Sequence, residues 1–334
     1  MTASDSDTFQ TQTFLTIRAF TLDRRQTTPK KIRYLLEYIL FRIFLLPMQM
    51  ISLKGICLLA QFLGKTLYHA SPKRRKIARI NLDIAFGDTK TAEEKKRIAQ
   101  QSMIYMVMIA LQCLWVTRNT KQRIYQLFPS RPEGIEHLNE ALKHGKGAFY
   151  LMAHYGNWEA LGMYWGYNNF SQVYSIARKL DNPHFEKFII NLRTSSGGGV
   201  FHKEGSPLKV VRALKKNYCV GVMMDQNGGI GGLFVDFFGK KAATPRSLAL
   251  LSYSTGAPVL PLIPYPTEKG TYQAVLFPEL KLEKTGNKDA DIFRWTEEYQ
   301  KVLEKIIRER PEPWMWFHRR WKTRPPEEGR NIIY

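Results

Sequence analysis

Residues 147–162, GAFYLMAHYGNWEALG, place a titratable histidine between a predicted strand and a predicted helix. The apolar run before His154 is typical of a short buried strand, and the residues after the turn have helical character. On one continuous helix, His154 and Glu159 would point about 140° apart. They meet only if the chain bends between them, and Gly156 permits such a bend. We therefore predict a strand–loop–helix site with a His154–Glu159 pair.

Predicted strands and helices alternate in the rest of this half of the chain. The further strands cover residues 172–178, 218–224, 256–263 and 271–277, and helices begin near residues 183, 206, 245 and 289. This pattern indicates an α/β fold with a mixed, mostly parallel sheet flanked by helices. In such sheets, ligands bind beyond the carboxyl ends of the strands. Because His154, Arg178 and Asp225 each follow a predicted strand, we predict a site where these strand ends meet.

A histidine backed by a carboxylate is suited to removing a proton from a hydroxyl group. The carboxylate fixes the tautomer and stabilises the imidazolium. No GxSxG motif and no nucleophilic cysteine lies beside His154, so direct attack by a bound hydroxyl is favoured over a covalent intermediate. Arg178, or backbone N–H groups at the helix start, would stabilise an oxyanion. A His-x4-Glu spacing alone is a weak signal, because most such spacings arise by chance.

The chain divides by composition into four segments. They are a flexible N-terminal lead (1–30), a membrane-associated helical segment (31–70), a catalytic domain (71–325) and a C-terminal tail (326–334). The longest charge-free run of the second segment, residues 43–53, is shorter than the roughly 20 residues of a clean membrane span. With basic residues before it, we predict one anchoring helix, tilted or lying in the interface. A buried hairpin of core helices is the alternative.

The charge of the chain favours acidic partners. Its formal net charge is +21, which suits a nucleic acid, an anionic membrane surface, a phosphorylated lipid or an acidic carrier protein. The basic residues are scattered and no nucleic-acid-binding motif is present, which disfavours the first of these. The aromatic run 314–321 is expected to close the core rather than to stack on bases.

Two smaller features complete the pattern. The basic run at residues 73–76 is either a solvated helix face or a patch that faces a membrane or substrate. The three cysteines are far apart and show no CxxC spacing. They are expected to be buried free thiols, and no metal site is visible by spacing.

The segment HYGNWE, from His154 to Glu159, resembles the His-x4-acid motif of the lysophospholipid acyltransferase superfamily. It is most similar to the lipid A biosynthesis acyltransferases, the lauroyl/myristoyl type of Gram-negative bacteria. Further segments share that family's pattern: SPKRRKIARINLDIAF at 71–86, RKLDNP at 178–183, DQN at 225–227 with FFG at 237–239, and WMWFHRRWKTR at 314–324. The resemblance covers about residues 35–325. The first 30 residues and the glycine-rich loop 228–232 have no counterpart in it.

The resemblance implies a glycerol-phosphate-acyltransferase-like fold with an N-terminal membrane anchor. It implies an inner-membrane enzyme whose catalytic domain faces the cytoplasm. That enzyme would move a fatty acyl chain from acyl carrier protein, or from acyl-CoA, to a hydroxyl of a lipid A precursor. The expected partners are acyl carrier protein, a phosphorylated lipid acceptor and an anionic membrane surface, with no nucleic acid. No cofactor is expected beyond the acyl donor.

By the same resemblance, His154 is the general base and Glu159 orients it. The residues expected to bind the oxyanion or the substrate are Arg178, Asn157, Asn182, Asp225 and Gln226. The motifs do not separate lipid A precursors from other acceptors, so acylation of a phosphatidylinositol mannoside, an ornithine lipid or a lysophospholipid stays open. A basic nucleic-acid-binding protein and an inactive scaffold are alternatives from other classes.

Overall fold

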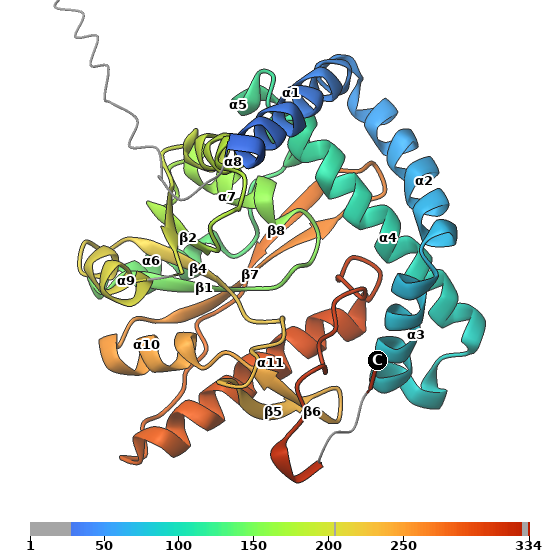
Figure 1. Cartoon of the computed structure of the whole chain (residues 1–334). Helices are drawn as coiled ribbons and strands as arrows, with labels where there is room; N and C mark the ends of the chain where they lie inside the picture. Colours follow the sequence, from blue (N-terminus) through green and yellow to red (C-terminus); the bar gives the residue numbers. More distant parts are fainter. Residues whose placement is uncertain (1–27, 204, 329–332) are drawn as a thin grey trace, which may run out of the picture.

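A computed structural model describes residues 28–203, 205–328 and 333–334. Its centre is a six-stranded sheet with the strand order β3-β2-β4-β1-β7-β8 (Figure 1). The strands are β1 (Ala148–Met152), β2 (Val173–Ala177), β3 (Gly199–His202), β4 (Cys219–Met223), β7 (Val259–Pro266) and β8 (Tyr272–Leu276). Only the β7–β8 pair is antiparallel among these strands. The predicted mixed, mostly parallel sheet flanked by helices is confirmed.

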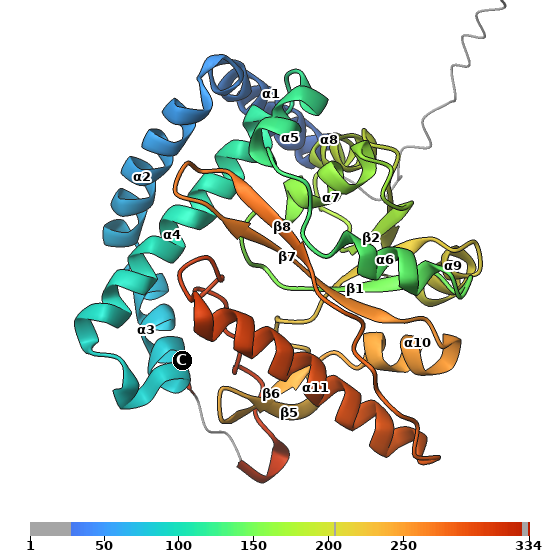
Figure 2. The same cartoon turned by 180° about the vertical axis from the view of Figure 1, so that it is seen from behind.

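Helices cover both faces of this sheet (Figures 1 and 2). From residue 120 onward they are α5 (Thr120–Leu127), α6 (Ile135–Leu142), α7 (Trp158–Tyr167), α8 (Pro183–Thr194), α9 (Ser206–Leu214), α10 (Ser247–Thr255) and α11 (Lys288–Glu309). Alternate residues of β1 point to opposite faces. Phe149 and Leu151 join a core with α9, α10 and α11, whereas Ala148 and Tyr150 join a core with α5, α6 and α7. The central strand is therefore buried on both sides.

A separate two-stranded hairpin, β5 (Leu233–Phe237) and β6 (Lys240–Thr244), packs against α11 (Figure 1). Its two-residue loop is Phe238-Gly239, and both residues have positive φ, 57° and 72°. Such a loop matches the right-handed twist of paired strands. The sequence patterns above did not predict β5, β6 or β3, which lie beside glycine-containing loops.

The N-terminal part consists of α1 (Thr28–Met50), α2 (Leu53–Ala70), α3 (Pro72–Phe86) and α4 (Ala92–Trp115), and short 3-10 helices lie at Gly87–Thr89 and Pro326–Glu328. Residues 31–70 form two helices rather than the single helix predicted, because Ser52 caps a second helix with its side chain, and the membrane anchor stays a prediction. The predicted lead, residues 1–30, lies almost entirely outside the described residues. Among the described helices, α4 alone is long and apolar enough to span a membrane, and half of its apolar stretch is buried in the protein.

The exposed surface of α1 and α2 is unusually apolar. These two helices lie on the outside of the molecule, along α4 (Figures 1 and 2). Leu40 and Phe62 are 67% and 68% exposed. Further large apolar side chains exposed on the two helices are Ile32, Leu35, Leu36, Ile39, Ile43, Phe44, Leu46, Met50, Leu58 and Leu67. The alternative of a buried hairpin of core helices fits only in part, because the same two helices also bury Leu45 and Ile56 in the protein.

Candidate active site

The bend predicted after β1 is present at Gly156. This residue has a φ of +54°, and a Cβ atom there would lie 2.0 Å from the carbonyl oxygen of Pro264. Its backbone N–H donates to the carbonyl of Pro313, 3.3 Å away, so the loop is attached to the C-terminal segment. Only glycine combines this dihedral angle with this close approach. The bend turns the chain from β1 into α7 and leaves His154 at the carboxyl edge of the sheet.

Asp225 is the residue that binds His154. Because β1 and β4 are parallel and Met152 is paired with Met223, both residues lie two positions beyond the paired strand ends. The Oδ1 atom of Asp225 lies 2.8 Å from Nδ1 of His154. Its Oδ2 atom accepts two further hydrogen bonds of 2.8 Å, from the backbone N–H of His154 and from the indole N–H of Trp314. Three donors thus fix one buried carboxylate.

The electrostatics of this pair favour a charged carboxylate and a basic imidazole. Burial raises the pKa of Asp225. The charge of His154 and the hydrogen bonds that the Asp225 carboxylate accepts outweigh burial and hold that pKa at about 2. Burial lowers the pKa of His154, whereas Asp225 and, more weakly, Glu159 raise it, so the net pKa is above the ordinary 6.5. The carboxylate accepts from Nδ1–H, which leaves Nε2 as the basic nitrogen.

The surroundings of Nε2 suit a position for a hydroxyl group. The Nε2 atom of Gln226 lies 3.3 Å from Nε2 of His154, and an amide donor there fits an unprotonated imidazole nitrogen. The ring of Trp158 meets the imidazole edge-on with the centroids 4.9 Å apart. The His154 side chain keeps 18% of its surface exposed, so solvent or substrate reaches it.

Glu159 does not form the predicted pair with His154. Its carboxylate binds the guanidinium of Arg193 on α8, with Oε2 accepting from Nε at 2.8 Å and Oε1 accepting from an Nη group. The physical reason is the start of α7 at Trp158, which directs the next side chain toward α8. In this geometry the carboxylate that contacts the imidazole of His154 is that of Asp225 and not that of Glu159.

The other predicted binding residues have different positions. Asn157 is fully buried, caps α7 through its side-chain oxygen and donates to Gln112 at 2.9 Å. Asn182 caps α8 and donates to Tyr34 and Glu37 of α1. Both side chains are hydrogen-bonded within the protein, and their predicted binding of substrate stays a prediction.

Arg178 is exposed at the carboxyl end of β2. Because β4 lies between β2 and β1, Arg178 is on the same edge as His154. Within the described residues it makes no hydrogen bond or ion pair with His154 or Asp225. Its predicted contact with an oxyanion or a phosphate stays a prediction.

The C-terminal segment supplies site residues that the strand-end pattern did not identify. Trp314, Trp316 and Trp321 are at most 1% exposed, which confirms the prediction of a core-closing run. Trp314 also donates to Asp225, and His318 accepts a hydrogen bond from the backbone N–H of Asn227 at its Nε2 atom, 3.0 Å away. The only sequence signal for these contacts was the run WMWFHRRWKTR itself.

In the described part of the chain, no group of histidine, cysteine and acidic side chains is arranged to hold a metal ion.

Comparison with known proteins gives a consistent result. A family model described as bacterial lipid A biosynthesis acyltransferase matches residues 24–323. The palmitoleoyltransferase of lipid A biosynthesis from Escherichia coli K12 is 26% identical over 278 residues, 82% of this chain and 87% of that protein. The lauroyltransferase of lipid A biosynthesis from the same organism is 26% identical over 269 residues, which are 79% of this chain and 84% of that protein. A phosphatidylinositol mannoside acyltransferase from Mycobacterium tuberculosis H37Rv is 33% identical over 132 residues, which are 38% of this chain and 42% of that protein.

Proposed function

The chain belongs to the bacterial lipid A biosynthesis acyltransferase family, and on this premise we propose that it transfers a fatty acyl chain from acyl carrier protein, or from acyl-CoA, to a hydroxyl of a lipid A precursor. The observation that carries the proposal is the His154–Asp225 pair at the carboxyl edge of the sheet. It provides a base for a hydroxyl group within a chain that the family model matches almost throughout.

The reaction follows from the free nitrogen of His154. Nε2 takes the proton of the acceptor hydroxyl while the hydroxyl oxygen attacks the carbonyl carbon of the thioester. The carbon–sulfur bond then breaks, and the thiolate takes the proton back from the imidazolium. The products are an ester on the acceptor and a free thiol. Asp225 stabilises the imidazolium between the two proton transfers, as the acid does in a catalytic triad.

The charge of the chain supports both expected substrates. Acyl carrier protein and a phosphorylated glycolipid are acidic, and the formal net charge of this chain is +21. Opposite charges raise the rate of encounter, and salt screens the effect. No additional cofactor is required, because the thioester already carries the activated acyl group.

The apolar surface of α1 and α2 supports association with the inner membrane. Side chains exposed on these helices would leave water on contact with lipid, and each fully buried one contributes roughly 1.5–3 kcal/mol. The helices would then lie in the interface, with the catalytic domain on the cytoplasmic face.

We expect Leu40→Asp combined with Phe62→Asp to lower the membrane-bound fraction about tenfold or more, because both side chains are removed from the proposed contact. The measurement is sedimentation with membrane vesicles. Leu208→Asp on α9 is the matched control, since Leu208 is 71% exposed elsewhere on the molecule. An unchanged bound fraction in the double variant would contradict the membrane contact.

Acylation of a phosphatidylinositol mannoside is the second candidate function. It is favoured by the higher local identity to the mycobacterial relative, 33% over 132 residues. The discriminating assay supplies the purified protein and one acyl donor with either a lipid A precursor or a phosphatidylinositol mannoside. We expect a product of increased mass from the lipid A precursor. A product from the mannoside alone would overturn the first proposal and support the second.

A further inference from the structure

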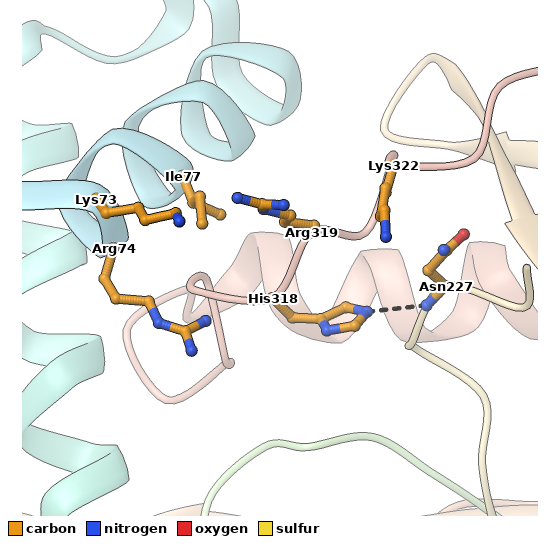
Figure 3. Close-up of a pocket in the computed structure, with 7 residues that line it drawn as sticks. All are labelled: Lys73, Arg74, Ile77, Asn227, His318, Arg319 and Lys322. Atoms are coloured by element: carbon orange, nitrogen blue, oxygen red, sulfur yellow. Dashed lines mark hydrogen bonds between the residues drawn. The ribbon is translucent and has the colours of Figure 1, made fainter. Parts of the chain in front are cut away.

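A basic pocket lies beside the candidate active site, between the start of α3 and the C-terminal segment (Figure 3). Its volume is about 530 Å³. Its polar lining consists of four cationic side chains and two neutral ones: Lys73, Arg74, Arg319, Lys322, Asn227 and His318. The pocket unites two sequence features that lie far apart in the chain, the basic run at 73–76 and the run WMWFHRRWKTR.

The two sides of the pocket are held together by the protein's own hydrogen bonds. The side-chain amide of Asn81 on α3 donates to the carbonyls of Trp316 and His318, at 2.7 Å in each case. The guanidinium of Arg74 donates to the carbonyl of Phe317 at 3.3 Å. The position of the cations therefore depends on the fold and not only on flexible surface chains.

The charges of the pocket are uncompensated. Its lining contains no acidic residue. Within the described residues, none of Lys73, Arg74, Arg319 and Lys322 forms an ion pair with a carboxylate. Four converging positive charges repel one another, and a bound anion relieves that repulsion. An anion of more than one charge fits this arrangement best.

His318 adds a neutral imidazole to the lining of the pocket. Its Nε2 atom accepts from the backbone N–H of Asn227, so a neutral ring carries its proton on Nδ1. Burial lowers the pKa of His318 to about 4, so the ring is neutral at pH 7.

The pocket lies near the catalytic edge of the sheet. Asn227 follows Asp225 by two residues. His318 lies close enough to Asp225 and His154 for the charges of both to shift its pKa. A group bound here would therefore sit next to the hydroxyl that His154 is proposed to deprotonate.

We propose that this pocket binds a phosphate monoester of the membrane-lipid acceptor, an assignment that rests on the proposed function. A phosphate monoester carries close to two negative charges and three acceptor oxygens, which suits a pocket lined by four cationic side chains. The lipid, rather than a soluble phosphate, is favoured by position. Only Ser71 separates α3 from the end of α2, whose exposed Leu67 and Phe62 belong to the proposed membrane surface.

The test uses Lys73→Gln combined with Lys322→Gln in the full-length chain. Both side chains are exposed and make no hydrogen bond or ion pair to the rest of the described chain, so the variant should fold normally. The matched control is Lys215→Gln combined with Lys216→Gln, which removes the same charge from an exposed site after α9.

Binding is measured by sedimentation with phosphatidylcholine vesicles that contain either phosphatidic acid, a monoester, or phosphatidylglycerol, a diester, at equal surface charge. We expect the unmodified protein and the control to prefer the monoester vesicles about tenfold, since charge-assisted hydrogen bonds are the strong ones. The pocket variant should lose that preference. Equal binding of all three proteins to both vesicles, or a preference kept by the pocket variant, would overturn the proposal.

Inorganic phosphate at constant ionic strength separates the two sources of phosphate. We expect it to compete poorly, because it lacks the contribution of the membrane. Displacement at concentrations far below that of the lipid would assign the pocket to the free ion and overturn the lipid assignment.

Acyl-transfer assays on the same proteins distinguish a failure of the proposed phosphate site from a failure of the proposed acyltransferase function. With saturating donor, we expect the KM for the phosphorylated acceptor to rise about tenfold in the pocket variant. A lost monoester preference together with no transfer by the unmodified protein would refute the proposed function and leave the phosphate site. Transfer with unchanged KM and unchanged preference would refute the site and leave the function.

Discussion

Replacing His154 with alanine is expected to lower kcat for acyl transfer by about a thousandfold or more. The imidazole is the proposed base for the acceptor hydroxyl, and a positioned general base typically contributes about 10²–10⁴. Asp225 would keep its hydrogen bonds from the backbone N–H of residue 154 and from Trp314, so its charge remains partly satisfied. The substitution should therefore lower kcat much more than it lowers the stability of the fold.

Two measurements separate catalysis from stability in this variant. Thermal unfolding should show a folded protein, and the control His144→Ala, at an exposed position away from the site, should turn over normally. Near-normal turnover by the purified His154→Ala protein would refute the proposed mechanism.

Replacing Asp225 with asparagine is expected to lower kcat by about a thousandfold, through the tautomer of His154. The Oδ2 atom of Asp225 accepts from two N–H donors, so the amide oxygen of an asparagine would take that position. The amide NH₂ would then face Nδ1 of His154, where Oδ1 is now. Nδ1 would become an acceptor and the proton would move to Nε2, which removes the base.

The pH profile identifies which acid acts on His154. The base must be deprotonated, so kcat/KM should rise with pH, with a midpoint above 6.5 because Asp225 raises the pKa of His154. In Asp225→Asn the midpoint of the residual activity should fall, since burial then lowers the pKa unopposed by that charge. Glu159→Gln is the matched control and should shift the midpoint less. An equal loss and an equal shift in both variants would contradict the assignment of Asp225.

The sequence located the edge of the sheet where the site lies but not the partner of His154. Three strand ends were predicted to converge, and His154 and Asp225 do meet because β1 and β4 are parallel neighbours. That neighbour relation depends on long-range pairing, which no local pattern encodes. Glu159 was favoured because it is close in sequence, yet α7 begins just before it and carries it toward Arg193.

Asn157 and Asn182 were predicted to bind substrate although their sequence context fits a simpler role. Asparagine is a preferred helix N-cap, and Asn182 precedes Pro183, which favours the first helical position. The basic pocket shows the opposite case. Its two sides were recognised as separate basic runs, and only the packing of α3 against the C-terminal segment joins them. Strand order and side-chain direction thus account for most of the differences.

The most direct test of the central claim is mass spectrometry of lipids from cells that lack this gene and express either the unmodified protein or His154→Ala. We expect one additional acyl chain on lipid A with the unmodified protein and none with the variant. The same lipid A from both strains, or a change confined to other phospholipids, would contradict it.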